Sequence, residues 1–441
     1  MNKSDSERVK ALLRSRNHKP AKSAWTANLI VINCCSVRQS AMDRIYAQIN
    51  KFVVLKKKII LAGCLLESDK KKLLNKNVSF WHPDEYFEKL PIRENKFRAF
   101  APIMTGCNNF CAYCVVPFAR GREKSRPAEK IIAEVKSLVK KEYKEIVLLG
   151  QNVNSFRSLT DYRLPTTAKN KKAVVGSRST VVDFPELLRL INTLPGDFWL
   201  TFLTSHPKDM SDELIETVVQ CQKISPHIHL PIQSGDNAIL KKMNRHYTVA
   251  HYKGLIKKLR AAFNQARTDR RRPLFPPLAI STDIIVGFPG ETDKQFQNTA
   301  KLMREIKFDM AYIARYSPRP GTAASKLKDS VSPAVKKCRE KILNEILKKT
   351  ALANNKKYPG KTAAVLVEEI KRDFIFGKTQ TNKTVKFSIG RHPDPAATRS
   401  ESLTNYSAAS RHRNNRRIAI GQIVTVKIIN AAPWGLKGKL C

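Results

Sequence analysis

Three cysteines, Cys107, Cys111 and Cys114, lie within one short run with the spacing C-x₃-C-x₂-C. Thiolates this close together can bind a [4Fe–4S] cluster, which needs four ligands, so one iron is left open to bind another molecule. Zinc is an alternative, but structural zinc sites favour two paired arms, and no second arm stands nearby. Three unrelated buried thiols are the remaining alternative. The spacing favours the cluster.

The composition limits the class of protein. A chain of 441 residues with 42% apolar residues has room for two or three domains with real cores. No stretch approaches the roughly 20 apolar residues of a membrane-spanning helix, and the amino terminus lacks an apolar signal region. The nine cysteines are odd in number and clustered, which argues against a disulfide framework and predicts a cytoplasmic protein.

The charge of the chain is strongly positive. Lys and Arg total 81 against 37 Asp and Glu, which gives a formal net charge of +44. Such a surface is expected to bind polyanions such as RNA, with an affinity that falls steeply with salt. A Lys-rich source proteome is the alternative explanation for part of this excess.

The elements that position the cysteines can be predicted from apolar patterns. In residues 1–95, strands are expected at 27–33 and 58–62 with a helix between them, and each strand runs into a cysteine, Cys35 or Cys64. This pattern predicts a small parallel α/β domain, in which ligands gather at the carboxyl ends of the strands.

Residues 100–332 repeat a strand–helix rhythm, which predicts a parallel sheet or a partial β/α barrel. Strands are expected at 145–149, 198–204, 227–231, 279–286 and 310–316, and helices at 129–141, 185–193, 209–220 and 249–265. The segments 157–180 and 267–277 are interpreted as flexible additions.

The last part of the chain has a different pattern of apolar residues. A Lys-rich helix after Pro333 leads to short strands expected at 362–368, 383–388 and 422–429, so residues 355–441 are predicted to form a small β-barrel. Residues 392–417 are interpreted as a disordered insertion within it.

Several motifs in a fixed order resemble the radical S-adenosylmethionine (SAM) methylthiotransferases, and among them the branch that acts on tRNA. They cover nearly the whole chain: Met1–Arg8, Val31–Arg38, Ala62–Leu65, Gly106–Arg126, Leu148–Ser155, Ser205–Pro207, His229–Gly235, Asp283–Thr292 and Tyr316–Thr322. The carboxyl-terminal part resembles an RNA-binding TRAM domain.

The resemblance implies the cofactors. Cys107, Cys111 and Cys114 would hold the radical [4Fe–4S] cluster, and SAM bound to its open iron would be cleaved to a 5′-deoxyadenosyl radical. The loop Gly287, Phe288, Pro289, Gly290 and Glu291 is a candidate SAM contact, because its two glycines allow a close backbone approach. A tight strand–helix turn is the alternative interpretation of this loop.

The resemblance also implies a second, auxiliary [4Fe–4S] cluster that delivers sulfur, with Cys35 and Cys64 as two of its ligands. The third ligand of the family would stand two residues before Met1, and the strand that precedes it is missing as well, so the resemblance implies a Rossmann-like amino-terminal domain without its first strand. A start placed too late, a truncated chain and a genuine loss are the three explanations, and we favour the first. Cys34 is not expected to substitute, because neighbouring side chains on a strand point to opposite faces.

The resemblance implies methylthiolation of carbon 2 of isopentenyladenosine at position 37 of tRNA, where an unpaired base can enter the barrel. Threonylcarbamoyladenosine in tRNA, an aspartate of a ribosomal protein, and RNA binding without catalysis are the alternatives. Gln233 and Ser234 are candidate base contacts. The expected partners are the tRNA anticodon loop, an electron donor and a sulfur donor, with no membrane and a monomeric enzyme.

For most of the remaining polar residues and cysteines, a structural role is the simpler interpretation. The run Arg120–Arg126 is a candidate for binding a phosphate or carboxylate, or for a buried ion pair with Glu123. His206 and His229 are interpreted as core histidines near the barrel mouth. Cys221, Cys338 and Cys441 match no motif and are expected to be core or surface thiols.

Overall fold

The computed structural model describes residues 1–36, 39–74, 77–160, 180–268, 277–372, 374–388 and 418–441. The segment 392–417 and most of the two segments interpreted as flexible additions lie outside these residues. Within the described part of the chain, no helix is both long enough and apolar enough to cross a membrane.

The amino-terminal unit is a parallel sheet, as predicted, but it has three strands where the sequence predicted two. The strands follow the order β1-β2-β3, and helix α2 packs on β1 and β2 through an apolar core that includes Met42 and Ile49. Strands β1 and β2 end on Cys35 and Cys64, which are register partners. The elements are α1 (Asn2–Ser15), β1 (Leu29–Cys35), α2 (Gln39–Val54), β2 (Lys58–Cys64), α3 (Glu67–Lys71), β3 (Val78–Phe80) and α4 (Asp84–Phe87).

The central unit is a partial β/α barrel, which confirms the predicted fold class. Two three-stranded parallel sheets, β4-β7-β10 and β11-β12-β13, adjoin where Leu200 on β10 bridges Ile224 just before β11. The strands are β4 (Arg98–Pro102), β7 (Glu145–Leu149), β10 (Trp199–Phe202), β11 (His227–His229), β12 (Ala279–Val286) and β13 (Met310–Arg315). Strand β4 is an addition to the five predicted strands, and β7 and β12 match their predicted bounds.

Amphipathic helices cover this barrel and share one large apolar core with its strands. They are α6 (Ala128–Lys140), α7 (Phe184–Asn192), α8 (Asp212–Gln220), α9 (Asn237–Lys242), α10 (Val249–Thr268), α11 (Asp293–Ile306) and α12 (Pro333–Asn355). Short elements stand at the loops: β5 (Met104–Thr105), α5 (Val116–Arg120), β6 (Lys124–Ser125), and the 3₁₀ turns η1 (Val153–Ser155), η2 (Pro207–Asp209) and η3 (Ala323–Lys326).

The two ends of the first predicted flexible addition are ordered. β8 (Arg157–Thr160) pairs antiparallel with β9 (Thr180–Asp183), so the prediction was wrong at these ends. Val182, on β9, is fully buried in the barrel core, and Asp183 caps helix α7 by accepting from the Glu186 amide. These contacts explain why a polar-looking segment begins and ends as strand.

The carboxyl-terminal unit is a closed five-stranded barrel, as the strand pattern predicted. Its strands follow the order β14-β15-β16-β18-β17. They are β14 (Thr362–Lys371), β15 (Phe374–Thr379), β16 (Thr384–Ser388), β17 (Ile423–Ala432) and β18 (Gly435–Leu440). Strands β15 and β18 were not predicted, because glycines and lysines interrupt their apolar pattern.

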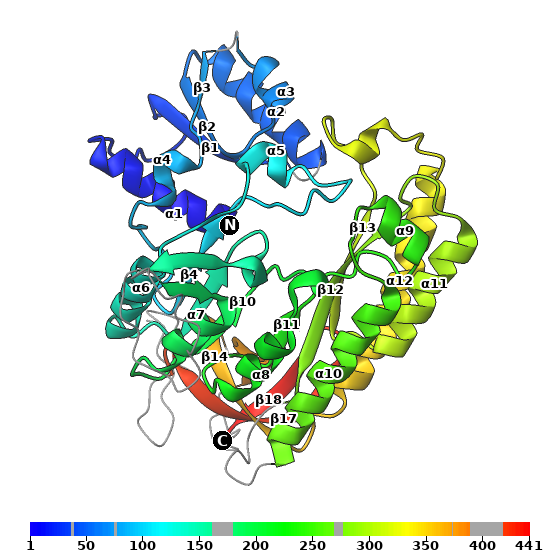
Figure 1. The fold of residues 1–441 in the computed structure, drawn as a ribbon. Helices are drawn as coiled ribbons and strands as arrows, with labels where there is room; N and C mark the ends of the chain where they lie inside the picture. The colour runs from blue at the N-terminus through cyan, green and yellow to red at the C-terminus, as the bar shows by residue number, and fades with distance from the viewer. Residues whose placement is uncertain (37–38, 75–76, 161–179, 269–276, 373, 389–417) are drawn as a thin grey trace, which may run out of the picture.

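The three units stack along the barrel axis (Figure 1). The amino-terminal sheet lies over the carboxyl ends of the barrel strands, where Arg319 reaches Asp69. The small barrel lies at the opposite end, where Arg98 pairs with Glu368 and Phe97 packs on Leu366. The ligand-binding end of the β/α barrel is therefore covered by the sheet that bears Cys35 and Cys64.

Candidate active site at the mouth of the barrel

The three clustered cysteines lie on the loop that follows β4 and β5, at the carboxyl ends of the barrel strands. Gly106 opens this loop with a φ of +78°, and a Cβ there would stand 2.1 Å from the Arg122 carbonyl oxygen. Only glycine allows this close approach. The loop then runs to helix α5, so all three thiols belong to one short segment.

Residues from the far side of the barrel hold the cysteine loop in place. The Ala112 amide donates to the Met243 carbonyl at 2.9 Å, and the Asn244 side chain donates to the Phe110 carbonyl at 2.9 Å. The Ala324 amide donates to the Ala112 carbonyl at 2.8 Å. The loop is thus fixed by segments that lie more than one hundred residues away in the sequence.

Each of the three sulfurs accepts one hydrogen bond. Cys107 accepts from the Asn109 side chain at 3.7 Å, Cys114 from the Val116 amide at 3.5 Å, and Cys111 from the Arg245 guanidinium at 3.3 Å. Burial raises the pKa of the Cys107 thiol, and burial together with Cys111 raises the pKa of Cys114 to about 12. These thiols therefore favour the protonated form unless a cation stabilises the thiolates.

Arg245 was not singled out from the sequence. Its side chain is buried and also donates to Tyr247 and to the Pro231 carbonyl. The cysteine that it contacts is 134 residues away, and no local pattern marks the pair. A buried guanidinium beside Cys111 provides positive charge where a thiolate-ligated group would carry negative charge.

The second pair of cysteines lies on the sheet that covers the barrel. Cys35 and Cys64 end neighbouring strands, and the Cys64 sulfur accepts a hydrogen bond from the Arg120 Nε at 2.8 Å. Arg120 also pairs with Asp5, and both side chains are almost completely buried. Cys34 points into the apolar core of the sheet, as the alternation of side chains predicted.

The Arg120–Arg126 run makes ion pairs, but not with the predicted partner. Arg120 pairs with Asp5, and Arg126 pairs with Glu134 at 2.8 Å. Glu123 instead accepts from the Asn108 amide and the Ser155 hydroxyl. The Glu123 assignment was wrong because the chain packs α5 against the amino-terminal sheet, which brings Asp5 to Arg120.

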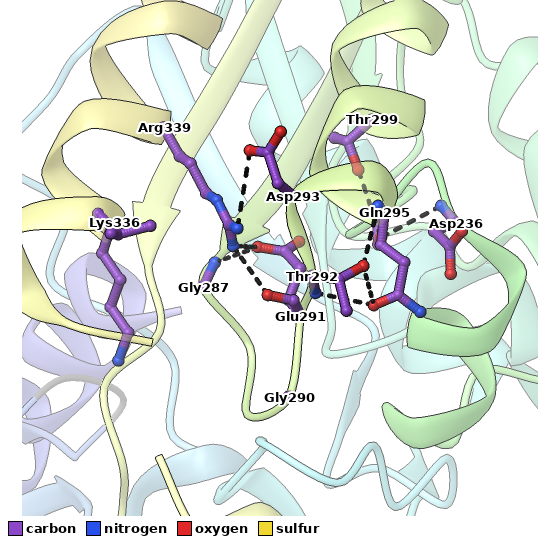
Figure 2. A network of polar contacts seen from close by, with 12 residues as sticks. Asp236, Gly287, Gly290, Glu291, Thr292, Asp293, Gln295, Thr299, Lys336 and Arg339 are labelled. Carbon is purple, nitrogen blue, oxygen red and sulfur yellow. Dashed lines mark hydrogen bonds and ion pairs between the residues drawn. The ribbon is translucent and has the colours of Figure 1, made fainter. Parts of the chain in front are cut away.

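The loop Gly287–Glu291 is tied to helix α12 (Figure 2). Glu291 accepts from the Gly287 amide at 2.7 Å and from Arg339 at 2.8 Å, and Gly287 lies so close to Lys336 that a Cβ would stand 2.3 Å from its Cγ. Thr292 and Gln295 form a capping box at the start of α11. This geometry supports a rigid strand–helix turn.

The same loop also reaches the cysteine segment. Phe288 is fully buried in a small apolar cluster with Ala112 and Tyr316, and Tyr113 packs against that cluster. Pro289 and Gly290 stand at the tip, where the Gly290 amide donates to Ser330. The loop therefore packs against the cysteine segment through Phe288.

A cavity of about 710 Å³ opens beside the cysteine loop and is lined by Tyr113, Cys114, Gln233, Asp283 and Tyr312, among others. Gln233 has a left-handed φ of 72° and is held by two backbone hydrogen bonds to β12, which direct its side chain. Ser234 has no access to this cavity, because it is fully buried and its hydroxyl lies 3.4 Å from Thr299.

The remaining histidines and cysteines lie in the core or at the surface. His206 is buried and accepts from the Lys208 amide, and burial lowers its pKa to about 2, as for a core histidine. His229 lies on β11 and contacts Ser281. Cys221 is buried, whereas Cys338 and Cys441 are exposed, as expected.

Comparison with known proteins agrees with this geometry. Residues 101–303 match the radical SAM superfamily, and residues 1–81 match the uncharacterized protein family UPF0004. The tRNA-2-methylthio-N(6)-dimethylallyladenosine synthase of Clostridium botulinum is 36% identical over 480 aligned positions, which cover 100% of this chain and 94% of the relative. The chain belongs to this synthase family. The synthase of Clostridium novyi is 35% identical, with the same coverage.

A solved structure of a radical SAM methyltransferase, TsrM from Kitasatospora setae, is similar at 10% identity, with a TM-score of 0.46 over 72% of this chain and 66% of that one. Membership of the radical SAM superfamily implies a [4Fe–4S] cluster and SAM binding.

The donor set fits the cluster that the synthase family implies. The described residues contain no preassembled group of three or more His, Cys, Asp or Glu side chains that could hold a metal ion. The cysteine loop nevertheless offers three thiols on one segment, each with a single hydrogen bond, and a buried arginine that can balance the charge of thiolates. Three thiolates leave one iron of a cube without a protein ligand.

Proposed function

We propose that the protein adds a methylthio group to carbon 2 of N(6)-dimethylallyladenosine in tRNA. The single observation that carries this function is the cysteine loop at the mouth of the barrel, in a chain that is similar over its full length to synthases of that name. SAM bound at a [4Fe–4S] cluster supplies the radical that removes hydrogen from an unreactive carbon.

Cys107, Cys111 and Cys114 would hold that cluster, and the chain's own residues would orient the two substrates. Gln233 and Asp283 line the cavity beside Cys114 and present an amide and a carboxylate to a purine edge. Gly287–Glu291 would contact SAM, and Ser234 would act through the backbone turn that aims Gln233. The amino-terminal sheet over the barrel would exclude water from the reacting atoms.

Cys35 and Cys64 would contribute to a second, sulfur-supplying [4Fe–4S] cluster. Their place supports this role, because both end strands of the sheet that covers the barrel, and Cys64 packs against Val115 and Ala119 just after the cysteine loop. An electron donor and a sulfur donor would complete the reaction, and we propose that the protein acts as a cytoplasmic monomer.

The carboxyl-terminal barrel would bind the anticodon loop of the tRNA as a TRAM-like unit. Phe374 is 42% exposed, and the Lys386 Nζ lies 3.6 Å from the centre of its ring. An exposed aromatic ring beside a lysine can stack on a base and pair with the adjacent phosphate. With the net charge of +44, this surface favours a nucleic-acid substrate over a ribosomal protein.

Analysis of tRNA from a deletion strain tests the function. We expect mass spectrometry of the nucleosides to show loss of the methylthio group while the dimethylallyl group remains, and re-expression to restore it. Loss of a methylthio group from threonylcarbamoyladenosine would assign the alternative substrate. Unchanged nucleosides in the deletion strain would refute the proposal.

Iron counting tests the second cluster separately. The anaerobically reconstituted protein should contain about 8 irons per chain if two cubes form, and about 4 if only the radical cluster forms. A Cys64→Ala variant should lose half of the iron and keep SAM cleavage. An iron content of about 4 that the variant does not change would leave the chain with one cluster and an RNA-binding role without sulfur insertion.

A further inference from the structure

A second cavity, of about 410 Å³, lies deeper in the barrel than the site beside Cys114. Its walls come from the barrel strands, and its floor comes from Lys378, Thr379, Gln380 and Asn382 of the carboxyl-terminal barrel. None of the cysteines and none of the residues Gly287–Glu291 lines it. It is therefore a separate compartment that the small barrel closes from below.

One wall of this cavity is largely apolar because of the strand register. Phe100, Val147 and Thr201 are register partners across β4, β7 and β10, and all three line the cavity. Trp199 lies one inward-facing position below this row, and Leu203 lies one above it. Aromatic and branched side chains therefore face the space together.

The opposite wall is polar, with two histidines and a serine on neighbouring strands. The Ser281 hydroxyl lies 3.0 Å from the His227 Nε2 and 2.9 Å from the His229 Nδ1. Burial lowers the pKa of His227 to about 3, so its ring is neutral at physiological pH. At the base of the cavity, Arg98 pairs with Glu145 and Glu368, and the Lys378 side chain adds a positive charge to the rim.

The deeper cavity meets the cavity beside Cys114 at one side chain. Tyr312 lines both, and its ring makes an edge-to-face contact with His229, with centroids 5.9 Å apart. His229 in turn lies 3.5 Å from Asp283, which lines only the upper cavity of the two. A ligand that passes Tyr312 can occupy both compartments at once.

We propose that the deeper cavity binds the dimethylallyl group of the substrate base, which makes Phe100, Val147 and Trp199 determinants of substrate specificity. This inference rests on the proposed function. Carbon 2 of the purine must face the cysteine loop, and the bond to the N(6) substituent leaves the ring in another direction. A branched five-carbon chain that points away from the cysteines enters the barrel past Tyr312. There it meets the apolar wall of β4, β7 and β10.

Val147→Phe tests this assignment by filling the cavity. Two anticodon stem-loop RNAs are compared by fluorescence anisotropy, one with N(6)-dimethylallyladenosine and one with unmodified adenosine at the same place. The wild-type protein should prefer the dimethylallyl RNA, and the variant should lose about 10- to 100-fold of that preference, the range for steric changes in an apolar pocket. Affinity for the unmodified RNA should stay the same.

Val181→Phe is the matched control, because this valine is 57% exposed on β9 and the change adds the same ring outside the barrel. Thr201→Leu, in the same register row, is a second filling variant should Val147→Phe fail to fold. Val147→Ala should in turn accept an RNA with the bulkier N(6)-benzyl group.

The outcomes separate this inference from the proposed function. The reconstituted enzyme could prefer the dimethylallyl RNA in binding but form no methylthiolated product. That result would refute the proposed function and still support the assignment of the pocket. If the enzyme forms product and both filling variants keep the preference for the dimethylallyl RNA, the assignment of the pocket is refuted. Equal binding of the two RNAs by the wild-type protein, or tighter binding of a threonylcarbamoyl RNA, would also overturn it.

Discussion

Replacing Cys107 with alanine is expected to abolish the reductive cleavage of SAM. The cysteine loop offers three thiols, and a cube held by two of them would expose a second iron to solvent. Burial raises the pKa of Cys107 and Cys114, so these thiols depend on the positive charge of bound iron to ionise and act as ligands. Release of 5′-deoxyadenosine from dithionite-reduced protein, measured by liquid chromatography and mass spectrometry, should fall to background.

Cys221→Ala is the control for this experiment, since Cys221 is 3% exposed in the barrel core and belongs to no motif. It should keep both the iron content and the cleavage activity. Cys107→Ala should lose the spectroscopic signal of one reduced cluster while its circular dichroism spectrum stays the same. Cleavage retained by Cys107→Ala would show that these three cysteines do not hold the radical cluster.

Local pattern was sufficient to predict most of the barrel and the cysteine loop. Strands β7 and β12 are continuous apolar runs bounded by polar loops, and their predicted bounds agree with the structure. Strand β15 was missed because Gly377 interrupts its pattern. A Cβ at Gly377 would stand 2.3 Å from the Leu366 carbonyl oxygen, so this glycine is required by barrel closure and not by local preference.

The contacts that complete the site could not be predicted, because they join residues that are far apart in the sequence. Arg245 reaches Cys111 across 134 positions, Arg319 reaches Asp69 across 250, and Arg120 reaches Cys64 across 56. An arginine at such a position has the same local pattern as a solvent-exposed one. Only the tertiary packing distinguishes them, within the barrel for Arg245 and between the amino-terminal unit and the barrel for Arg120 and Arg319.

Arg120 links the two cysteine sites, and its replacement with methionine is expected to have the largest effect on stability. Arg120 ends the helix that follows Cys114, donates to the Cys64 sulfur and pairs with Asp5. Methionine would leave the Asp5 carboxylate buried without its cation, which costs about 3–5 kcal/mol for a pair of this kind. The first transition in urea unfolding, followed by limited proteolysis of residues 1–95, should move to lower urea.

Arg122→Met is the matched control two residues along the same segment. The Arg122 guanidinium lies 4.3 Å from the centre of the Phe110 ring, and its loss should cost no more than about 1 kcal/mol. A double variant, Asp5→Asn with Arg120→Met, should recover much of the lost stability, because it removes the unpaired charge that Arg120→Met leaves. If Arg120→Met and Arg122→Met unfold at the same urea concentration, the buried pair does not hold the sheet on the barrel. If the double variant is stable but binds less iron than the wild type, the guanidinium acts on the Cys64 sulfur itself, apart from its role in joining the two units.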